Sequence, residues 1–94
     1  MRVRWLRKAL RNLDEEASYI ARDDAKAARL VVERVVGAVA MLADQPGLGR
    51  PGRVPGTREL IVEKTRHIVP YRVRGETVEI LRVSHTSRRL PEKW

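Results

Sequence analysis

The chain has 94 residues, no cysteine and a formal net charge of +8. Its length leaves room for one domain, residues 1–94, because a chain this short buries only roughly two-thirds of the surface it exposes when unfolded. The missing cysteines exclude disulfides, thiolate metal sites and thiol nucleophiles, whereas the positive charge favours partners with phosphate backbones, acidic segments or anionic lipid.

Residues 1–5 are predicted to form a short strand, after which the spacing of apolar residues becomes helical. One face of this first helix carries Leu6, Leu10, Leu13, Ala17 and Ile20, alternately four and three residues apart. The opposite face carries Lys8, Arg11, Glu15, Ser18 and Arg22. Arginines interrupt every apolar run near the N-terminus, so no secretion signal is expected.

Asp23 and Asp24 interrupt this pattern and are predicted to cap a second helix, because their carboxylates can accept hydrogen bonds from its first N–H groups. The second helix is expected to run to about Ala43, so that the two helices form a hairpin. Its broad apolar face comprises Ala25, Ala28, Val31, Val32, Val35, Val36, Val39, Met41 and Leu42. The helix also carries Glu33 and Arg34 and is too short to cross a bilayer, so a soluble cytoplasmic protein is expected.

Residues 46–56 hold three of the five prolines and four of the six glycines, and are predicted to form a loop. The loop lacks the features of a phosphate-binding loop and is expected to tolerate alanine at Gly49 and Gly52. Three β-rich runs follow, at residues 58–63, 67–73 and 77–85.

A turn at Gly75 is predicted to join the last two strands. Pro70 cannot donate a ladder hydrogen bond, so its strand is expected to be edge-like or bulged there. The order β-α-α-β-β-β predicts an α+β fold, in which an N-terminal strand and a two-helix hairpin pack on a small antiparallel sheet. One face of the sheet stays open, and function is expected where that face is basic.

Three segments of the C-terminal half resemble the RelE/ParE superfamily of bacterial toxins; they read PGRVPGTRELIV, HIVPYRV and VEILRVSHTSRR. The resemblance extends over nearly the whole chain and implies a single RelE/ParE-like toxin domain. It further implies a type II toxin-antitoxin system, of the kind associated with plasmid stabilisation, in which a cognate ParD-like antitoxin wraps the toxin in a hetero-oligomer. ParE-type members inhibit DNA gyrase, whereas RelE-type members cut messenger RNA in the ribosome.

The two branches differ at one strand position. Ribonuclease members carry a phosphate-contacting arginine three residues before the tyrosine that corresponds to Tyr71, and this chain has Ile68 there. Glu59 and Ile61 stand where RelE has basic residues. Arg66 is displaced from the lost arginine by two residues, or roughly 6.5 Å along a strand, which is a large shift for catalysis. A ParE-like gyrase inhibitor is therefore expected, with an mRNA endoribonuclease or a non-toxic basic module as alternatives.

The guanidinium group of arginine can make bidentate contacts with phosphates and carboxylates. A group of basic residues in the C-terminal half is therefore the predicted target-binding site. It comprises Arg58, Arg82, His85, Arg88 and Arg89. His85 would be the acid-base residue of a ribonuclease if the strand register brought His67 beside it; otherwise it packs at a strand end. Two histidines make a poor metal site, and no cofactor is expected. The candidate antitoxin-binding face, or else a solvated surface, is Arg7, Lys8, Arg11, Glu15 and Arg22 of the first helix.

Overall fold

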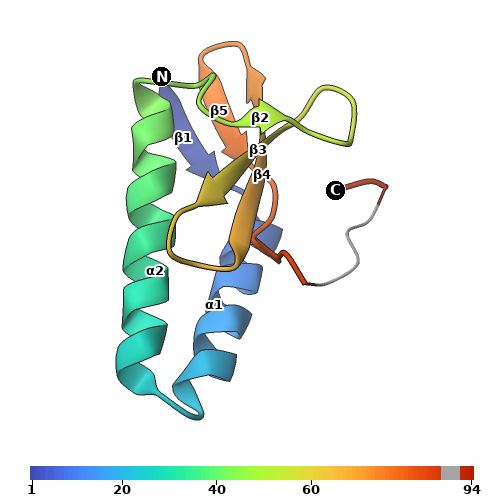
Figure 1. Ribbon diagram of the computed structural model, residues 1–94. Helices are drawn as coiled ribbons and strands as arrows, with labels where there is room; N and C mark the ends of the chain where they lie inside the picture. Colours follow the sequence, from blue (N-terminus) through green and yellow to red (C-terminus); the bar gives the residue numbers. More distant parts are fainter. Residues whose placement is uncertain (88–91) are drawn as a thin grey trace.

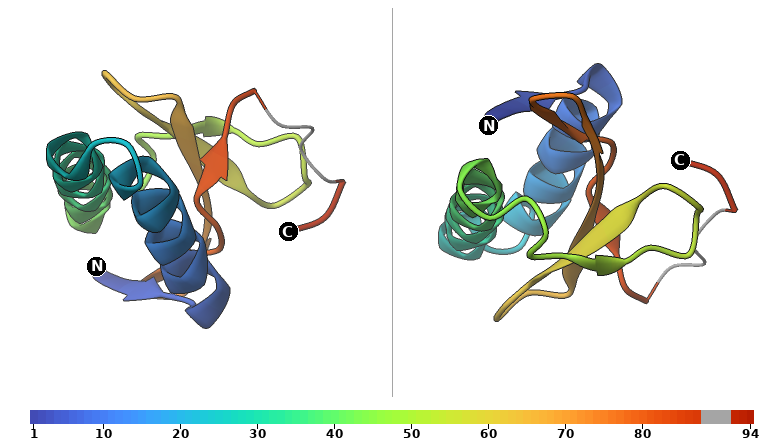
Figure 2. Two further views of the ribbon diagram at one scale, coloured as in Figure 1. Left: turned by 90° about the horizontal axis from the view of Figure 1, so that it is seen from below. Right: turned by 90° about the horizontal axis from the view of Figure 1, so that it is seen from above.

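The computed structural model describes residues 1–87 and 92–94, and two helices lie on one face of a six-stranded sheet (Figure 1). In both views of Figure 2, the helices lie on one side of the sheet and the end of the chain lies on the other. The elements are β1 (Arg2–Trp5), α1 (Arg7–Ala21), α2 (Ala25–Ala40), a 3-10 turn (Met41–Ala43), β2 (Arg50–Pro51), β3 (Arg58–Val62), β4 (His67–Arg74), β5 (Thr77–Ile80) and β6 (Ser84–His85). The predicted α+β fold is confirmed. Within the described ranges, no helix is long and apolar enough to cross a membrane.

The sheet is mixed. Its strands follow the order β1-β5-β4-β3-β2, and β6 pairs with β4 beyond the end of β5. All these pairs are antiparallel except β1 and β5, which run parallel. Parallel neighbours need a long connection, and here both helices and three strands separate β1 from β5 along the chain.

The buried face of α1 is offset by one residue from the predicted face. Ala9 and Glu16 are buried and Leu13 packs against the core, whereas Leu10 is 51% exposed. The assignment of Leu10 to the buried stripe is therefore wrong. A leucine suits burial better than a glutamate does, but the glutamate faces a histidine of the sheet, as described below.

α2 begins as predicted and packs as predicted over most of its length. The Asp24 carboxylate caps it by accepting a hydrogen bond from the Ala27 N–H at 3.0 Å. Val39 is among its buried residues. The predicted widening of its apolar face is wrong at Val36 and Met41, which are 45% and 49% exposed. These two side chains contribute to apolar surface that the described residues leave uncovered.

Pro70 lies in the centre of the sheet, opposite a β-bulge. Between the last pair of β4 with β5 and the first pair of β4 with β6, β4 advances by three residues, whereas the segment that joins β5 to β6 advances by four. The Pro70 carbonyl accepts a hydrogen bond from the Leu81 N–H at 2.9 Å, but proline has no N–H to offer in return. The prediction of an edge-like or bulged strand at Pro70 is therefore wrong for β4, which is a central strand, because the extra residue lies in the opposing segment between β5 and β6.

The glycine-rich loop before β3 is tied to the core by a buried tyrosine. The Tyr71 hydroxyl donates to the Pro46 carbonyl and accepts from the Gly49 N–H, both at 2.8 Å. A Cβ at Gly49 would lie 2.7 Å from Tyr71 Cε1, and a Cβ at Gly52 would lie 2.4 Å from Thr57 Oγ1. The expectation that this loop tolerates alanine at both glycines is therefore wrong.

Gly49→Ala is expected to destabilise the fold by about 2 kcal/mol, within the range for overpacked sites. The ring of Tyr71 cannot move aside freely, because two hydrogen bonds hold its hydroxyl. Urea denaturation followed by circular dichroism measures the change. Gly47→Ala is the control, since no atom lies within 4 Å of its added carbon, and it should cost less than about 0.5 kcal/mol. Equal stabilities of the two variants would contradict this account.

Candidate functional site

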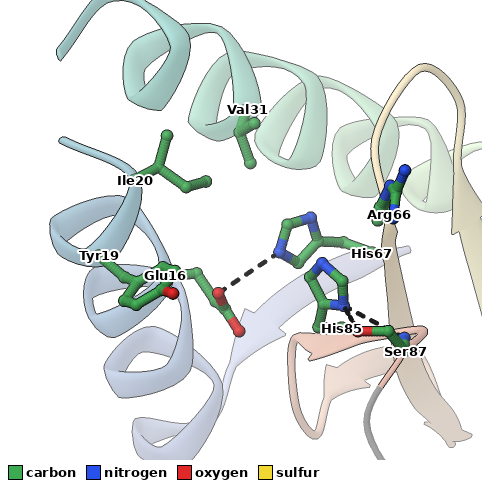
Figure 3. A pocket seen from close by; sticks show the side chains of 8 residues that line it. All are labelled: Glu16, Tyr19, Ile20, Val31, Arg66, His67, His85 and Ser87. Carbon is green, nitrogen blue, oxygen red and sulfur yellow. Dashed lines mark hydrogen bonds and ion pairs between the residues drawn. The ribbon is translucent and has the colours of Figure 1, made fainter. Parts of the chain in front are cut away.

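A pocket of about 460 Å³ opens between the helical hairpin and the sheet, where β4 begins and β6 ends (Figure 3). Its lining residues are Glu16, Tyr19, Ile20, Val31, Arg66, His67, His85 and Ser87. α1 and α2 supply the first four, and the sheet and its flanking residues supply the others. Both histidines of the chain therefore lie in one pocket.

The strand register places the two histidines side by side. His67 and His85 are directly paired across β4 and β6, and their rings meet edge to face with centroids 5.2 Å apart. Both side chains point to the helix side of the sheet, where His67 Nε2 lies 3.7 Å from Glu16 Oε2. His67 and Glu16 are each 4% exposed, whereas His85 is half-buried. The strand register therefore places His67 beside His85, which is the condition that an acid-base role of His85 requires.

Hydrogen bonds from Ser87 identify Nδ1 as the ring nitrogen of His85 that accepts a hydrogen bond. The Ser87 N–H donates to His85 Nδ1 at 3.1 Å, and Ser87 Oγ lies 2.6 Å from the same atom. Nδ1 is then an acceptor, so the neutral ring carries its proton on Nε2. A carboxylate, a buried histidine and a half-buried histidine therefore lie in succession, an arrangement that can hold or pass a proton. Among the described residues, no group of three or more histidine or acidic side chains is placed to hold a metal ion.

The predicted target-binding arginines do not gather at this pocket. Arg58 donates to the carbonyls of Gly49 at 2.7 Å and Gly47 at 3.4 Å, and so braces the loop before β3. Arg82 donates to its neighbouring Leu81 carbonyl at 2.6 Å and to the Trp94 carbonyl. Arg58 and His85 pair with opposite ends of a five-residue stretch of β4, and these ends lie roughly 13 Å apart. Arg88 and Arg89 lie outside the described residues.

The predicted antitoxin-binding residues share one property, which is that all are exposed on α1 or just after it; they are Arg7, Lys8, Arg11, Glu15 and Arg22. Exposure agrees with either a binding face or a solvated surface, so the assignment stays a prediction. Leu10, on the same helix and also exposed, adds an apolar side chain to this face.

An apolar groove of about 690 Å³ runs between α2 and β3. Its walls include Met41, Leu48 and Ile61, which are 44% to 54% exposed. Gly37 lies at its helical wall, and no atom lies within 4 Å of the position a Cβ would take. Glycine in a helix costs about 1 kcal/mol relative to alanine, and neither packing nor backbone within the described chain requires it here. The groove was not predicted from the sequence.

One edge of β3 beside this groove lacks a strand partner among the described residues beyond Glu59. β2 pairs only with Arg58 and Glu59, while β4 pairs along the whole other edge. Successive residues of β3 direct their backbone N–H and C=O groups to alternate edges of the strand. Glu59 and Pro70 pair without hydrogen bonds between their backbones, so the N–H and C=O of Ile61, two residues further on, point to the unpaired edge. An apolar groove next to an open strand edge is suited to binding an extended or helical peptide.

The face of the sheet away from the helices carries a second surface that sequence reasoning missed. The tripeptide Arg-Val-Arg occurs twice, at residues 2–4 in β1 and 72–74 in β4, on either side of β5. The two valines pair with Val78 and point to the helix side, so the arginines point to the open face. Alternation of arginine and valine was the available signal, but the pairing of β1 with β5 is needed to bring the two segments together.

Three of these four arginines act on one glutamate, Glu79. Arg72 Nε lies 2.7 Å from Glu79 Oε1 and Arg74 Nη1 lies 3.8 Å from it. The hydrogen bond from Arg72, with the charges of Arg72, Arg74 and Arg4, holds the pKa of Glu79 below its ordinary value despite some desolvation. Glu79 is therefore ionised at neutral pH and offsets one of the four positive charges.

Comparison with known proteins gives concordant results. Residues 3–90 match the family described as "ParE toxin of type II toxin-antitoxin system, parDE". The chain is 47% identical over 91 residues to the Sinorhizobium fredii protein named "Putative toxin Y4kP", covering 97% of this chain and 94% of that protein. It is also similar to a chain of the solved structure "Chromosomal ParDE TA system from P. aeruginosa", with a TM-score of 0.81 and 34% identity. That match covers 90% of this chain and 95% of the other.

Proposed function

The chain belongs to the ParE toxin family and is the toxin component of a type II toxin-antitoxin system, and we propose that it inhibits DNA gyrase. Gyrase is an intracellular enzyme of bacteria, so the proposal places the toxin in the cytoplasm. The toxin binds its target and needs no cleavage centre of its own. The predicted target-binding residues belong to this proposal: Arg58, Arg82, His85, Arg88 and Arg89.

The observation that carries the gyrase proposal is that Ile68 and Glu59 occupy strand positions where ribonuclease members of the superfamily have basic residues. Ile68 occupies the position of the arginine and is 2% exposed. Glu59 is also 2% exposed and forms ion pairs with Arg50 and Arg53. A carboxylate whose charge is offset by arginines therefore stands where ribonuclease members have a basic residue. Loss of one well-placed donor typically costs about 100-fold to 1,000-fold in rate, so losing several leaves little nuclease activity.

The histidine pocket favours a second candidate, a ribosome-dependent mRNA endoribonuclease. His67 and His85 are in contact, and Arg66 lines the same pocket as a cation that could neutralise a phosphate. Two assays of the wild type and His85→Ala separate the candidates. The expected result is gyrase inhibition by the wild type, which His85→Ala weakens without abolishing, with messenger RNA left intact on ribosomes by both proteins. Cleavage of messenger RNA that His85→Ala abolishes, without gyrase inhibition, would establish the ribonuclease instead.

A cognate ParD-like antitoxin is the proposed partner, because the similar solved structure is named as a ParDE system. The groove between α2 and β3 is proposed as the site of its apolar anchor. Protein interfaces of high affinity usually centre on apolar contacts, while charge mainly accelerates encounter. The groove offers apolar walls, an unpaired strand edge and the open space beside Gly37.

The charged face of α1 is proposed as a second antitoxin contact, reached by a chain that wraps around the toxin. The five predicted residues on and after this helix carry four positive charges and one negative charge, so they suit an acidic partner. Together the two contacts would form a hetero-oligomer in which the antitoxin covers opposite sides of the helical layer.

A further inference from the structure

We propose that the open face of the sheet over β1, β5 and β4 binds the phosphate backbone of double-stranded nucleic acid. The binding residues are the four arginines of the two Arg-Val-Arg segments, which are Arg2, Arg4, Arg72 and Arg74. This surface is distinct from the histidine pocket and the α2–β3 groove. The inference is independent of the proposed action on gyrase.

The register places the four arginines in two parallel rows. Arg2 and Arg74 flank Thr77 in one row, and Arg4 and Arg72 flank Glu79 in the next. Strands lie about 4.8 Å apart and alternate residues of a strand about 6.6 Å apart, so the α-carbons form a rectangle of about 9.6 by 6.6 Å. A hollow over this area is lined by Arg2, Arg4, Arg74, Thr77 and Glu79, with Val3 at its edge.

The chemistry of this face favours phosphates. All four cations are arginines, whose planar guanidinium groups can donate two hydrogen bonds to a phosphate, and Glu79 pairs with two of them, Arg72 and Arg74. Arg2, Arg4 and Arg74 are exposed, so their guanidinium groups are accessible. Four arginines and one glutamate leave a local excess of three positive charges on this face, which attracts phosphate groups.

An acidic protein segment fits this face less well, because it lacks an apolar anchor. The side chains between the arginines are Thr77 and Glu79, and the apolar side chains at the centre of this face, Ile68 and Pro70, are less than 3% exposed. Stable protein interfaces have an apolar core, whereas binding to a nucleic-acid backbone is almost entirely electrostatic.

The face also indicates the form of nucleic acid. Single-strand binding usually relies on aromatic platforms for the bases, and the aromatic residue of β1, Trp5, belongs to the helix-side core. Both helices of the described residues lie on the other side of the sheet, so neither can enter a groove from this face (Figure 2). Backbone contacts without base contacts give binding that is independent of sequence.

The test is fluorescence anisotropy of a labelled 20-base-pair DNA duplex, titrated with the purified protein at several salt concentrations. Four phosphate contacts predict a slope of log K against log salt near −3.6, since each contributes about −0.9. Arg2→Gln/Arg4→Gln should flatten the slope by about 1.8. Lys26→Gln/Arg29→Gln removes two exposed charges from α2 and is the matched control, with the slope unchanged. Glu79→Gln should strengthen binding, because it removes the carboxylate that pairs with Arg72 and Arg74.

Several outcomes would overturn the proposal. Equal flattening by the two double variants would show that overall charge, and not this face, governs the interaction. Weaker binding by Glu79→Gln in a folded protein would also contradict it. If Arg2→Gln/Arg4→Gln weakens binding of the antitoxin and leaves the DNA slope unchanged, the face binds acidic protein instead. Circular dichroism and thermal melts of each variant confirm that the fold persists.

Discussion

Replacing Gly37 by leucine is expected to weaken antitoxin binding by at least about 2 kcal/mol, or roughly thirtyfold in Kd, while leaving the toxin folded and active. The added side chain would fill the space at the helical wall of the α2–β3 groove, where no atom now lies within 4 Å. The toxin itself should become slightly more stable, because leucine has the better helix propensity. Calorimetric titration of the toxin with its antitoxin measures the change.

Two further variants sharpen this experiment. Ile61→Asp places a charge on the unpaired edge of β3 and should weaken the antitoxin complex in the same way. Ala25→Leu adds the same side chain to the exposed start of α2, about 18 Å from Gly37 along the helix, and should leave Kd unchanged. In cells, co-expressed antitoxin should fail to rescue growth only with the two groove variants. An unchanged Kd for both of them would exclude the groove as the anchor site.

Glu16→Ala is expected to destabilise the fold by about 3 kcal/mol, because it removes a buried carboxylate together with its contact to the buried ring of His67. Glu16 and His67 are each 4% exposed and 3.7 Å apart. A loss of this size is a large part of the total stability of a small domain, about 5–15 kcal/mol. Denaturant titration at neutral pH measures it.

Glu15→Ala provides a control of the same chemistry at the adjacent position. Glu15 is exposed on the outer face of α1, so its removal should change stability by less than about 0.5 kcal/mol. If the two variants were equally stable, the Glu16–His67 contact would contribute nothing to the fold. The histidine pocket would then lose its structural role, and a purely functional role for Glu16 would have to be considered.

Local patterns in the sequence were sufficient for the two helices and for β1, β3 and β4. They missed β2, which lies in the predicted loop, and the division of the predicted last strand into β5 and β6. The aspartate cap at Asp24, the apolar period of α2 and the glycine- and proline-rich loop each depend on neighbours within a few residues. The missing N–H of Pro70 was also recognised locally, but the bulge lies in the opposing segment and not, as the sequence had suggested, in the strand that carries the proline. These features led to the α+β order, which the structure confirms.

Features that depend on distant residues were either missed or left open. Glu16 looks like a surface residue of α1, and only the position of His67, on a strand far along the chain, accounts for its burial. The contact between His67 and His85 depends on the strand register, and a bulge shifts that register by one residue. Hydrophobic spacing carries no information on either.

The basic sheet face could be predicted only in part. Each Arg-Val-Arg segment alternates with period two, which indicates a half-buried strand with its arginines on the open side. That the two segments flank the same strand depends on the parallel pairing of β1 with β5, which joins opposite ends of the chain. The α2–β3 groove is likewise formed by elements that a long loop separates, so the position of Gly37 at its wall could not be predicted.

The most direct test of the account is a supercoiling assay in which purified gyrase, relaxed plasmid and ATP are incubated with increasing amounts of the free toxin. We predict that the toxin blocks supercoiling, and that addition of its antitoxin before gyrase restores it. A toxin that arrests growth in cells but leaves supercoiling unaffected at a large molar excess over gyrase would contradict the proposed function.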